Sequence, residues 1–183
     1  DDAGDLEPEI ATNGNGTWII TWRSSYDTGF IGSDTDILMS MSNNDGETWS
    51  SPTAINSSAA SDNFLYGLTE YLPLVVSNGA DTWVVARSHY DGNVGSSDKH
   101  LQYTVSHDNG LSWSLESQLS NSPIYYVNQQ LSIASNGSGT WIATWASIDT
   151  HSGTVGTDFD VMYSISTDDA RSWSAPFPLN HYA

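Results

Sequence analysis

The sequence of 183 residues contains no cysteine, and cations are scarce in it. Without cysteine, a disulfide framework, a thiolate metal site and a thiol nucleophile are all excluded. Lysine and arginine total 4 against 22 aspartates and glutamates, which gives a formal net charge of −18. Because nucleic acids and anionic membrane surfaces are bound through clustered cations, we expect neither as a partner.

Long hydrophobic runs are absent as well. No apolar stretch reaches the ~18 residues of a membrane-spanning helix, and no charged segment followed by an apolar one marks a signal peptide. The few cations, together with abundant Asn, Ser, Thr and Gly, are typical of secreted or cell-surface proteins, and we expect that location. The acidic charge favours solubility in such a setting, with calcium loading as the alternative explanation.

Three segments of nine residues repeat along the chain: SNNDGETWS (42–50), SHDNGLSWS (106–114) and STDDARSWS (166–174). Their tryptophans, Trp49, Trp113 and Trp173, are 64 and 60 residues apart (113 − 49 and 173 − 113). A second landmark keeps the same step, because an Asn-Gly pair precedes each of Trp18, Trp83 and Trp141. The chain therefore consists of three units of about 60 residues, at about 1–60, 61–122 and 123–183.

Each unit has the pattern of four β-strands. Apolar residues predict a first strand at 7–12, 72–77 and 130–135. After an Asn-Gly hairpin, a second strand is predicted at 17–22, 82–87 and 140–145. A long polar loop leads to a third strand at 36–42, 100–106 and 160–166, and the repeated segment turns into a fourth. No segment has the periodicity and caps of a helix.

Four short strands per repeat are typical of an all-β propeller, whose four-stranded blades surround an axis. The repeated segment has a physical role in such a blade. Its Ser opens the turn between the third and fourth strands, its Asp accepts backbone hydrogen bonds, and its Gly supplies a positive φ. Its Trp projects into the core between blades. The pattern S-x-D-x-G-x-[TS]-W resembles the Asp-box, the repeat of bacterial neuraminidases and their relatives.

The second box, Ser106 to Trp113, matches this pattern in full. In the first box Asn44 replaces the Asp, and in the third Ala170 replaces the Gly. An alanine forced to a positive φ costs roughly 1 kcal/mol, so we expect the third turn to be altered. With three boxes in register with the four-strand units, the resemblance to the sialidase-like family covers the whole chain.

The resemblance implies a ring of about six to eight blades. Three blades form an open arc with two bare sheet faces, and large apolar faces rarely stay exposed. We therefore expect two chains to close head-to-tail into a six-bladed homodimer with twofold symmetry. The alternative is that the chain is a section of a longer propeller.

Comparison of the three units separates architecture from function. The box residues and the tryptophans of the second and fourth strands recur in every unit, so they are interpreted as structural. Residues that differ between units are candidates for a site, and the long loops at 23–35, 87–99 and 146–159 carry most of them. In a propeller these loops lie at the end opposite to the boxes.

Arg23 and Arg87 both begin an R-S-x-Y-D sequence at the end of a second strand. The resemblance to sialidases implies three arginines that hold the substrate carboxylate, a role suited to planar guanidinium groups. The third unit has Ala146 instead. Arg23 follows Trp18 by five residues and Arg87 follows Trp83 by four, so the two side chains are expected to project differently.

Sugar binding at the loop end is predicted from flat aromatic rings beside Asp and Asn. The predicted ligand-binding residues are Arg23, Tyr26, Asp27, Arg87, His89, Tyr90, Asp91 and Asp149. Further aromatic residues predicted at this end are Phe64, Tyr66, Tyr125 and Tyr126. In the alternative interpretation the aromatic rings pack the loops, and each arginine pairs with a nearby acid such as Asp27 or Asp91.

The resemblance also implies a Tyr nucleophile paired with a Glu, and an Asp as acid and base. The candidates are Tyr71 beside Glu70, with Asp62 on the same connection. They match by residue type alone, and the family's F/Y-R-I-P-type arginine motif is absent.

Four acids are alternative calcium ligands, Asp34 with Asp36 and Asp158 with Asp160. Asp34, Asp98 and Asp158 each precede a box serine by eight residues, and capping of a turn or strand is the favoured role. In the middle unit His100 replaces the second Asp of the pair, which counts against calcium. No other metal or cofactor is expected.

The leading functional prediction is a secreted, sialidase-like propeller module that binds a glycan or another extracellular polymer without catalysis. A sialidase-like glycoside hydrolase completed by dimerisation is the first alternative. The second is a structural repeat segment of a larger surface protein.

Overall fold

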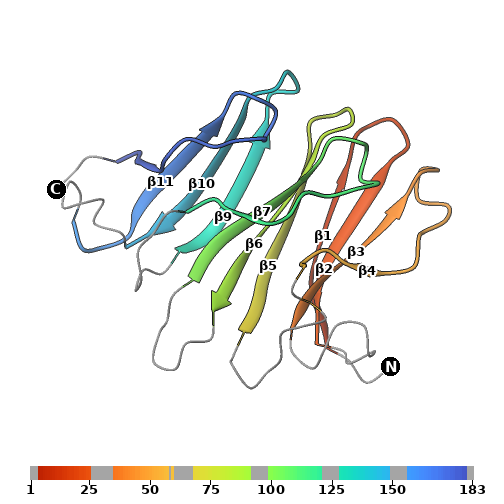
Figure 1. Cartoon of the computed structure of the whole chain (residues 1–183), viewed down its shortest axis with the longest axis horizontal. Coiled ribbons are helices and arrows are strands. Elements are labelled where there is room, and N and C mark those ends of the chain that lie inside the picture. The colour runs from red at the N-terminus through yellow and green to blue at the C-terminus, as the bar shows by residue number, and fades with distance from the viewer. Residues whose placement is uncertain are drawn as a thin grey trace.

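The computed structural model describes residues 4–25, 35–57, 59, 68–91, 99–120, 128–148 and 156–180. For residues 68–71, 90–91, 99 and 128–129 it describes the backbone alone. Three antiparallel sheets of four strands lie side by side in chain order (Figure 1). We call them blades 1, 2 and 3. No helix among the described residues is long and apolar enough to cross a membrane.

Within each blade the strands follow one another in sequence order. Blade 1 consists of β1 (Asp5–Thr12), β2 (Trp18–Ser24), β3 (Asp36–Ser42) and β4 (Thr53–Ala54). Blade 2 consists of β5 (Leu68–Ser77), β6 (Trp83–Asp91), β7 (Lys99–Ser106) and β8 (Ser117–Gln118). Blade 3 consists of β9 (Asn128–Ser135), β10 (Trp141–Ser147), β11 (Asp160–Ser166) and β12 (Phe177–Pro178).

The predicted first, second and third strands of all three units are confirmed, and β3 and β11 have the predicted bounds. The fourth strands are only two residues long, and each lies at the outer edge of its sheet. The opposite edges, β1, β5 and β9, lie next to one another and form the inner side of the arc.

The Asn-Gly hairpins repeat in detail. The Oδ1 atom of Asn13 accepts the backbone N–H groups of Asn15 and Thr17, at 2.8 and 3.2 Å. Asn78 and Asn136 make the same pairs of bonds in blades 2 and 3. The turn needs a positive φ after the asparagine, and Gly14 supplies it with φ 71°. This chemistry fixes where each first strand ends and each second strand begins.

Among the residues that the structure describes, the hydrophobic core forms two clusters, one between each pair of neighbouring blades. The first junction, between blades 1 and 2, is formed by Ile19, Ile37, Met39, Ile55, Val75, Trp83 and Val85, with Ala11, Met41 and Trp113 partly buried. The second junction, between blades 2 and 3, is formed by Val84, Ala86, Leu101, Tyr103, Val105, Leu119, Ile133, Trp141, Ala143, Trp145, Met162 and Ala170, with Leu74, Val76, Leu131 and Trp173 partly buried.

The interpretation of the recurring tryptophans as core is confirmed where a blade precedes them. Trp83 and Trp141 are fully buried in the two junctions. Trp113 and Trp173 pack against the same clusters, and Trp173 meets Tyr103 edge-on with ring centroids 5.9 Å apart. Trp49 is 39% exposed, because the side of blade 1 on which it lies faces no other blade of this chain.

Candidate functional site

The Asp-boxes form closed hydrogen-bond circuits within their own turns. In the second box, Ser106 Oγ donates to Asp108 Oδ1 at 2.7 Å and accepts the N–H of Gly110 at 2.9 Å. Asp108 then accepts the backbone N–H and the hydroxyl of Ser112, at 2.8 and 2.5 Å. The bonds from Ser112, together with the bond from Ser106, lower the pKa of Asp108 to about 2. A carboxylate held in this way is committed to its turn, which supports the structural interpretation of the boxes.

The two divergent boxes keep this circuit. Asn44 takes the place of Asp and donates from Nδ2 to Thr48 Oγ1 at 2.8 Å. Ala170 adopts φ 63°, and its N–H still reaches Ser166 Oγ at 3.0 Å. The third turn is therefore altered only in part, because its hydrogen-bond circuit is retained. One difference remains at Trp173, whose Nε1 atom is buried without a hydrogen-bond acceptor among the described residues.

The boxes and the Asn-Gly hairpins lie at the same end of the blades. The N–H of Asn109 in the second box donates to the carbonyl of Asp81 in the hairpin, at 2.8 Å. The third box makes the equivalent bond from Asp169 to Gly139, at 2.9 Å. A surface hollow of 330 Å³ over the second box is lined by Val105, His107, Asp108, Ser112, Trp113 and Ser114. Most of these residues have structural counterparts in every blade, so the candidate site is placed at the opposite end.

At the opposite end, Arg23 and Glu7 lie together on the inner strands of blade 1. The Nε atom of Arg23 is 3.6 Å from Oε2 of Glu7, and their side chains are 19% and 33% exposed. The same carboxylate oxygen accepts the N–H of Leu72 from β5 of blade 2, at 2.9 Å. A partly exposed guanidinium and carboxylate therefore lie side by side where the inner strands of blades 1 and 2 meet.

A backbone irregularity positions Glu7. The β1–β2 register shifts between Leu6 and Glu9, and Glu7 adopts φ 55°. Blades 2 and 3 have the same shift on their inner strands, with Leu72 at φ 50° and Gln130 at φ 55°. Such β-bulges redirect side chains and often lie near binding sites. The bulge recurs in all three blades, but among its three residues only Glu7 is charged.

Glu7 was not among the predicted site residues, although the sequence contains a signal for it. It is the residue before Pro8, at a position that differs between the units, where blade 2 has Leu72 and blade 3 has Gln130. That variation was the criterion applied to the loops. It was not applied to the first strands.

Arg87 has a different environment from Arg23, as the one-residue offset predicted. It opposes Gln102 across the sheet, whereas Arg23 opposes Ile37. The side chain is 2% exposed, and Nη2 donates to Gln102 Oε1 at 2.9 Å and to Glu116 Oε1 at 3.3 Å. Arg87 is therefore a structural arginine of the first junction, and the geometry does not support its predicted role in ligand binding.

Glu116 links this arginine to blade 1. Its carboxylate accepts the N–H of Ser57 and, at 2.7 Å, the hydroxyl of the same residue. Burial raises the pKa of Glu116, but the bonds from Ser57 and the charge of Arg87 outweigh burial and hold that pKa below its usual value. The first junction thus contains an ionised pair near its outer edge, with hydrogen bonds on both sides.

The other predicted site residues are partly described. The backbones of Glu70 and Tyr71 lie on β5 opposite His89 and Ser88, just before the bulge at Leu72. His89 is half-buried on β6, and the backbones of Tyr90 and Asp91 end that strand. Outside the described residues lie Tyr26, Asp27, Asp34, Asp62, Phe64, Tyr66, Asp98, Tyr125, Tyr126 and Asp149. The loop part of the predicted site therefore remains a prediction.

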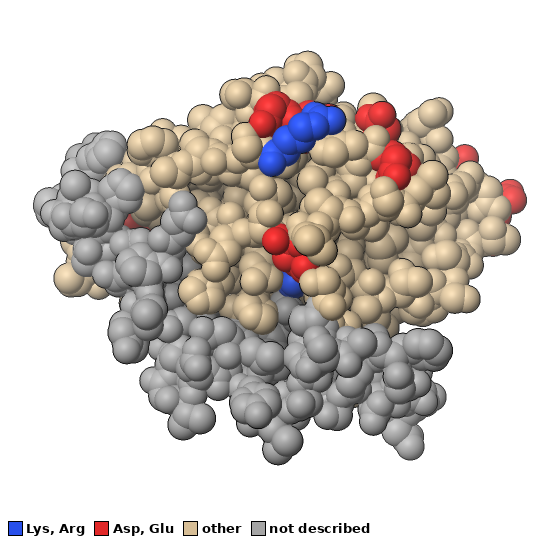
Figure 2. Space-filling view, in the orientation of Figure 1, with Lys and Arg blue, Asp and Glu red and all other residues tan. Residues whose placement is uncertain are grey.

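The buried acids at the start of the third strands are held by amides. Asp36 Oδ1 accepts from Asn56 Nδ2 at 2.6 Å, while Asn56 Oδ1 accepts the N–H of Ile37 at 3.1 Å. Asn180 holds Asp160 in the same way, at 2.6 Å. Among the described residues no group of three or more His, Asp or Glu is placed to hold a metal ion, and calcium binding by Asp34 with Asp36 or by Asp158 with Asp160 stays a prediction. Figure 2 shows the described surface on one face as largely uncharged, with scattered acidic groups.

The fold and the boxes define the class of the protein. The chain matches the family model of the BNR repeat-like domain over residues 16–182, and it belongs to that family. The suspected relationship to Asp-box proteins is thereby confirmed. No curated protein sequence matches the chain.

Among solved structures, the chain is similar to the Hadza microbial sialidase Hz136, with a TM-score of 0.67 and 19% identity over 96% of this chain and 38% of the sialidase. For the α-L-arabinanase of Penicillium chrysogenum, solved with arabinobiose, the TM-score is 0.63 and the identity 17%, over 97% of this chain and 50% of the enzyme. For the Trypanosoma rangeli sialidase, solved with sialic acid, the TM-score is 0.58 and the identity 17%, over 93% of this chain and 30% of the sialidase. The chain thus shares its fold with half or less of the length of each glycosidase.

Proposed function

We propose that the protein is a secreted carbohydrate-binding propeller module, with Arg23 and Glu7 as polar contacts for a saccharide at the inner edge of the blades. The observation that carries this proposal is the partly exposed Arg23–Glu7 pair, held by the bulge on β1 and by Leu72 of the next blade. Both groups suit sugar hydroxyls, because a guanidinium donates and a carboxylate accepts. The glycosidases with the same fold act on saccharides, which supports this class of ligand.

A neutral saccharide fits this site better than an acidic one. The formal net charge of −18 repels anions, and Glu7 already neutralises part of the charge of Arg23. The sequence contains three arginines, of which Arg87 is buried in the first junction and Arg171 lies in the third box. A single chain therefore does not bring three arginines together around a carboxylate, which favours binding of neutral sugars over sialidase chemistry.

A hydrolase is the second candidate, because the chain spans 38% and 50% of the sialidase and arabinanase to which it is similar. Catalytic groups on further blades would complete an active site around the same axis. Release of reducing sugar from neutral glycans, or cleavage of a fluorogenic sialoside, would support this candidate.

Binding is tested on an array of neutral and sialylated glycans, followed by calorimetric titration with each retained glycan and with arabinobiose. We expect neutral glycans to be retained, and Arg23→Ala to weaken their binding about ten-fold through loss of a charge-assisted hydrogen bond. Arg171→Ala is the matched control, since it also removes one arginine but lies in a box turn at the other end. Failure of the wild type to retain any glycan, or equal affinity in the Arg23→Ala variant, would overturn the proposal.

A further inference from the structure

The outer sheet face of blade 3 is apolar and bare, although the same face of blades 1 and 2 is buried. Ile142 is 44% exposed, whereas its counterparts Ile19 and Val84 are fully buried in the two junctions. The same contrast separates Val161 from Ile37 and Leu101, and Leu179 from Ile55 and Leu119. Blade 1 has the opposite bare face, with Trp49 partly exposed. Within this chain, two different halves of a blade junction are therefore unfilled.

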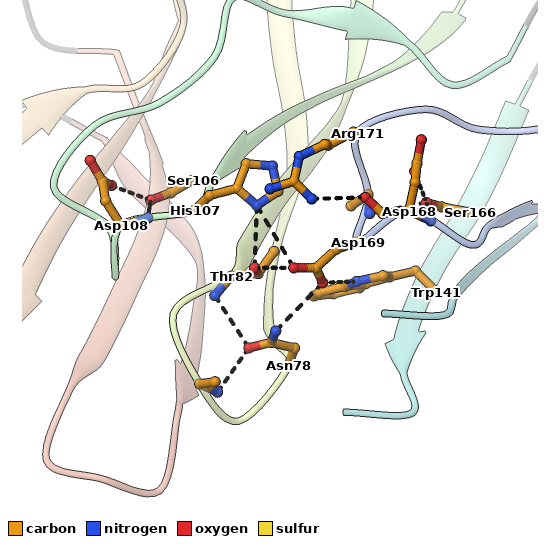
Figure 3. A network of polar contacts seen from close by, with 12 residues as sticks. Asn78, Thr82, Ser106, His107, Asp108, Trp141, Ser166, Asp168, Asp169 and Arg171 are labelled. Atoms are coloured by element: carbon orange, nitrogen blue, oxygen red, sulfur yellow. Dashed lines mark hydrogen bonds and ion pairs between the residues drawn. The ribbon is translucent and has the colours of Figure 1, made fainter. Parts of the chain in front are cut away.

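The two internal junctions show which residues of a neighbouring blade complete a junction. In the second junction Asp169, the fourth residue of its box, reaches the hairpin of the preceding blade. Its carboxylate accepts from Thr82 Oγ1 at 2.6 Å and from Asn78 Nδ2 at 3.5 Å, as well as from Trp141 of its own blade at 3.0 Å (Figure 3). In the first junction Asn109 takes this role, bonding Asn13 at 3.2 Å and Thr17 at 2.8 Å. Each junction thus joins the fourth box residue to an Asn and a Thr.

The fifth box residue is matched in size to the side chain that it faces on the preceding blade. A Cβ atom added to Gly110 would lie 2.7 Å from Cδ1 of Ile19 on blade 1, so the first junction pairs glycine with isoleucine. The third box has Ala170, fully buried in one cluster with Val84, the counterpart of Ile19. Compared with the first junction, the second junction therefore has one more methyl group at Ala170 and one fewer at Val84.

The two bare faces of this chain fit both patterns. The fourth box residue can bond to an Asn and a Thr, and the fifth matches the facing side chain in size. Blade 3 presents Asn136, Thr140 and Ile142 at the positions that receive a box. Blade 1 presents Asp45 and Gly46 at the fourth and fifth positions of its box. Asp45 facing Asn136 and Thr140 would repeat the residue types of the second junction, and Gly46 facing Ile142 would repeat the glycine–isoleucine pair of the first.

We propose that the bare face of blade 3 binds blade 1 of a second copy of this chain, head-to-tail, and that the reciprocal contact closes a ring of two chains. The open surroundings of Gly46 support this arrangement, since within the chain a Cβ added there meets only Trp49, at 3.8 Å. Asp45 also has the tryptophan partner that Asp169 has in the second junction. Trp18 Nε1 lies 3.5 Å from Asp45 Oδ1, and Trp141 Nε1 lies 3.0 Å from Asp169 Oδ1. Repulsion between two chains of net charge −18 opposes closure, so raised ionic strength should favour it.

The first test is the mass in solution, measured by light scattering after gel filtration over a range of protein and salt concentrations. We expect twice the 19.8 kDa of one chain, with the paired fraction rising with ionic strength. A one-chain mass under all conditions would overturn the proposal. An open series of larger species would overturn the closed pair.

A matched set of variants tests the contact itself. Gly46→Ala should raise the Kd of the pair about ten-fold, because its methyl group meets Ile142 of the second copy. Adding Ile142→Val should restore most of the affinity, since alanine with valine is the combination present in the second junction. Gly79→Ala is the control, because Gly79 also has a positive φ, of 82°, and has no atom within 4 Å of an added Cβ. A Gly46→Ala effect that Ile142→Val does not relieve would contradict the proposed contact.

Cysteine pairing tests the orientation, and the absence of native cysteine makes the result unambiguous. Mixing the Asp45→Cys chain with the Thr140→Cys chain should give a disulfide between one chain of each kind, because the equivalent Asp169 and Thr82 touch. Crosslinking of the Asp45→Cys chain to itself would indicate a face-to-face dimer and would overturn the head-to-tail arrangement.

Discussion

The two internal junctions are built on the same repeat but differ in the chemistry of their centres. At the second junction Trp145 projects from β10 into an apolar cluster, opposite Met162 across the sheet. The equivalent residue of blade 2 is Arg87, which projects into the first junction opposite Gln102. Both side chains are at most 3% exposed, so one backbone position holds either a buried indole or a buried cation.

The exchange involves three positions together. Blade 3 combines Trp145, Met162 and Pro176, and blade 1 has the same kind of set in Trp22, Leu38 and Pro52. Blade 2 has Arg87, Gln102 and Glu116 at these places, and its three side chains are hydrogen-bonded to one another through Arg87. In blade 2 the charge in the core is thus accompanied by polar or charged residues at both of the positions that face it.

Replacing Arg87 by Met should have the largest effect on this comparison. The change leaves Glu116, whose side chain is 13% exposed, without the cation that it faces. Removal of one partner of a buried ion pair costs about 3–5 kcal/mol, so we expect a loss of that size in the free energy of unfolding, measured by urea titration.

Two further variants show whether the ion pair is responsible. Adding Glu116→Gln to Arg87→Met should recover most of the loss, because the unpaired charge is then absent. Arg23→Met should cost about 0–1 kcal/mol, since Arg23 and Glu7 are both partly exposed. If Arg87→Met lowered the free energy of unfolding no more than Arg23→Met does, the ion pair of the first junction would not contribute to stability.

Gly110→Ala should have an intermediate effect, because it places a methyl group against the buried Ile19 of blade 1. Overpacking of this kind costs about 1–3 kcal/mol in the free energy of unfolding, measured by urea titration. Adding Ile19→Val converts the pair to the alanine and valine of the second junction and should recover part of the loss. No recovery would mean that the cost arises from the φ of 85° at Gly110 rather than from packing between blades.

The regular part of the fold was predictable from the sequence, because each signal is local. The Asn-Gly pairs ended the first strands, the box serines ended the third strands, and apolar residues between them located the sheets. The length of the fourth strands was not predictable from the repeat. Only two residues of each pair with a neighbour at the outer edge, for example Thr53 and Ala54 of β4.

The candidate site was predicted only in part, and the reason is register. Arg23 was identified by its type and position, and the offset between four and five residues indicated that Arg87 projects elsewhere. Glu7 was missed as a partner of Arg23, because the direction of its side chain depends on a bulge that appears only in the pairing of β1 with β2. Glu116 was missed for a similar reason, since it lies 29 residues from Arg87 along the chain.

A smaller effect than that of Gly110→Ala is expected of Asp169→Asn, which gives the second junction the amide of the first. Burial raises the pKa of Asp169, but the bonds from Thr82 and Trp141 and the charges of His107 and Arg171 outweigh it and lower that pKa below the ordinary 3.8. A lowered pKa in the folded state means that the stabilisation is complete above the unfolded value of 3.8 and is lost as the pH falls through the folded value. We therefore expect Asp169→Asn to cost about 1 kcal/mol of unfolding free energy at neutral pH, with a difference from the wild type that narrows in acid.

The reciprocal change, Asn109→Asp, assigns this acid sensitivity to one position. Thr17, Asn13 and Trp83 surround Asn109 as Thr82, Asn78 and Trp141 surround Asp169, so a carboxylate would find the same donors in the first junction. Asp108 and Asp168, each with a pKa of about 2, contribute acid sensitivity to every variant and cancel from the differences. Urea titrations from neutral pH down to pH ~3 should show the pH dependence of stability increase with Asn109→Asp and decrease with Asp169→Asn. Equal pH dependence in both variants would mean that the fourth box residue does not carry charge into the junctions, and that the acid response comes from the box turns alone.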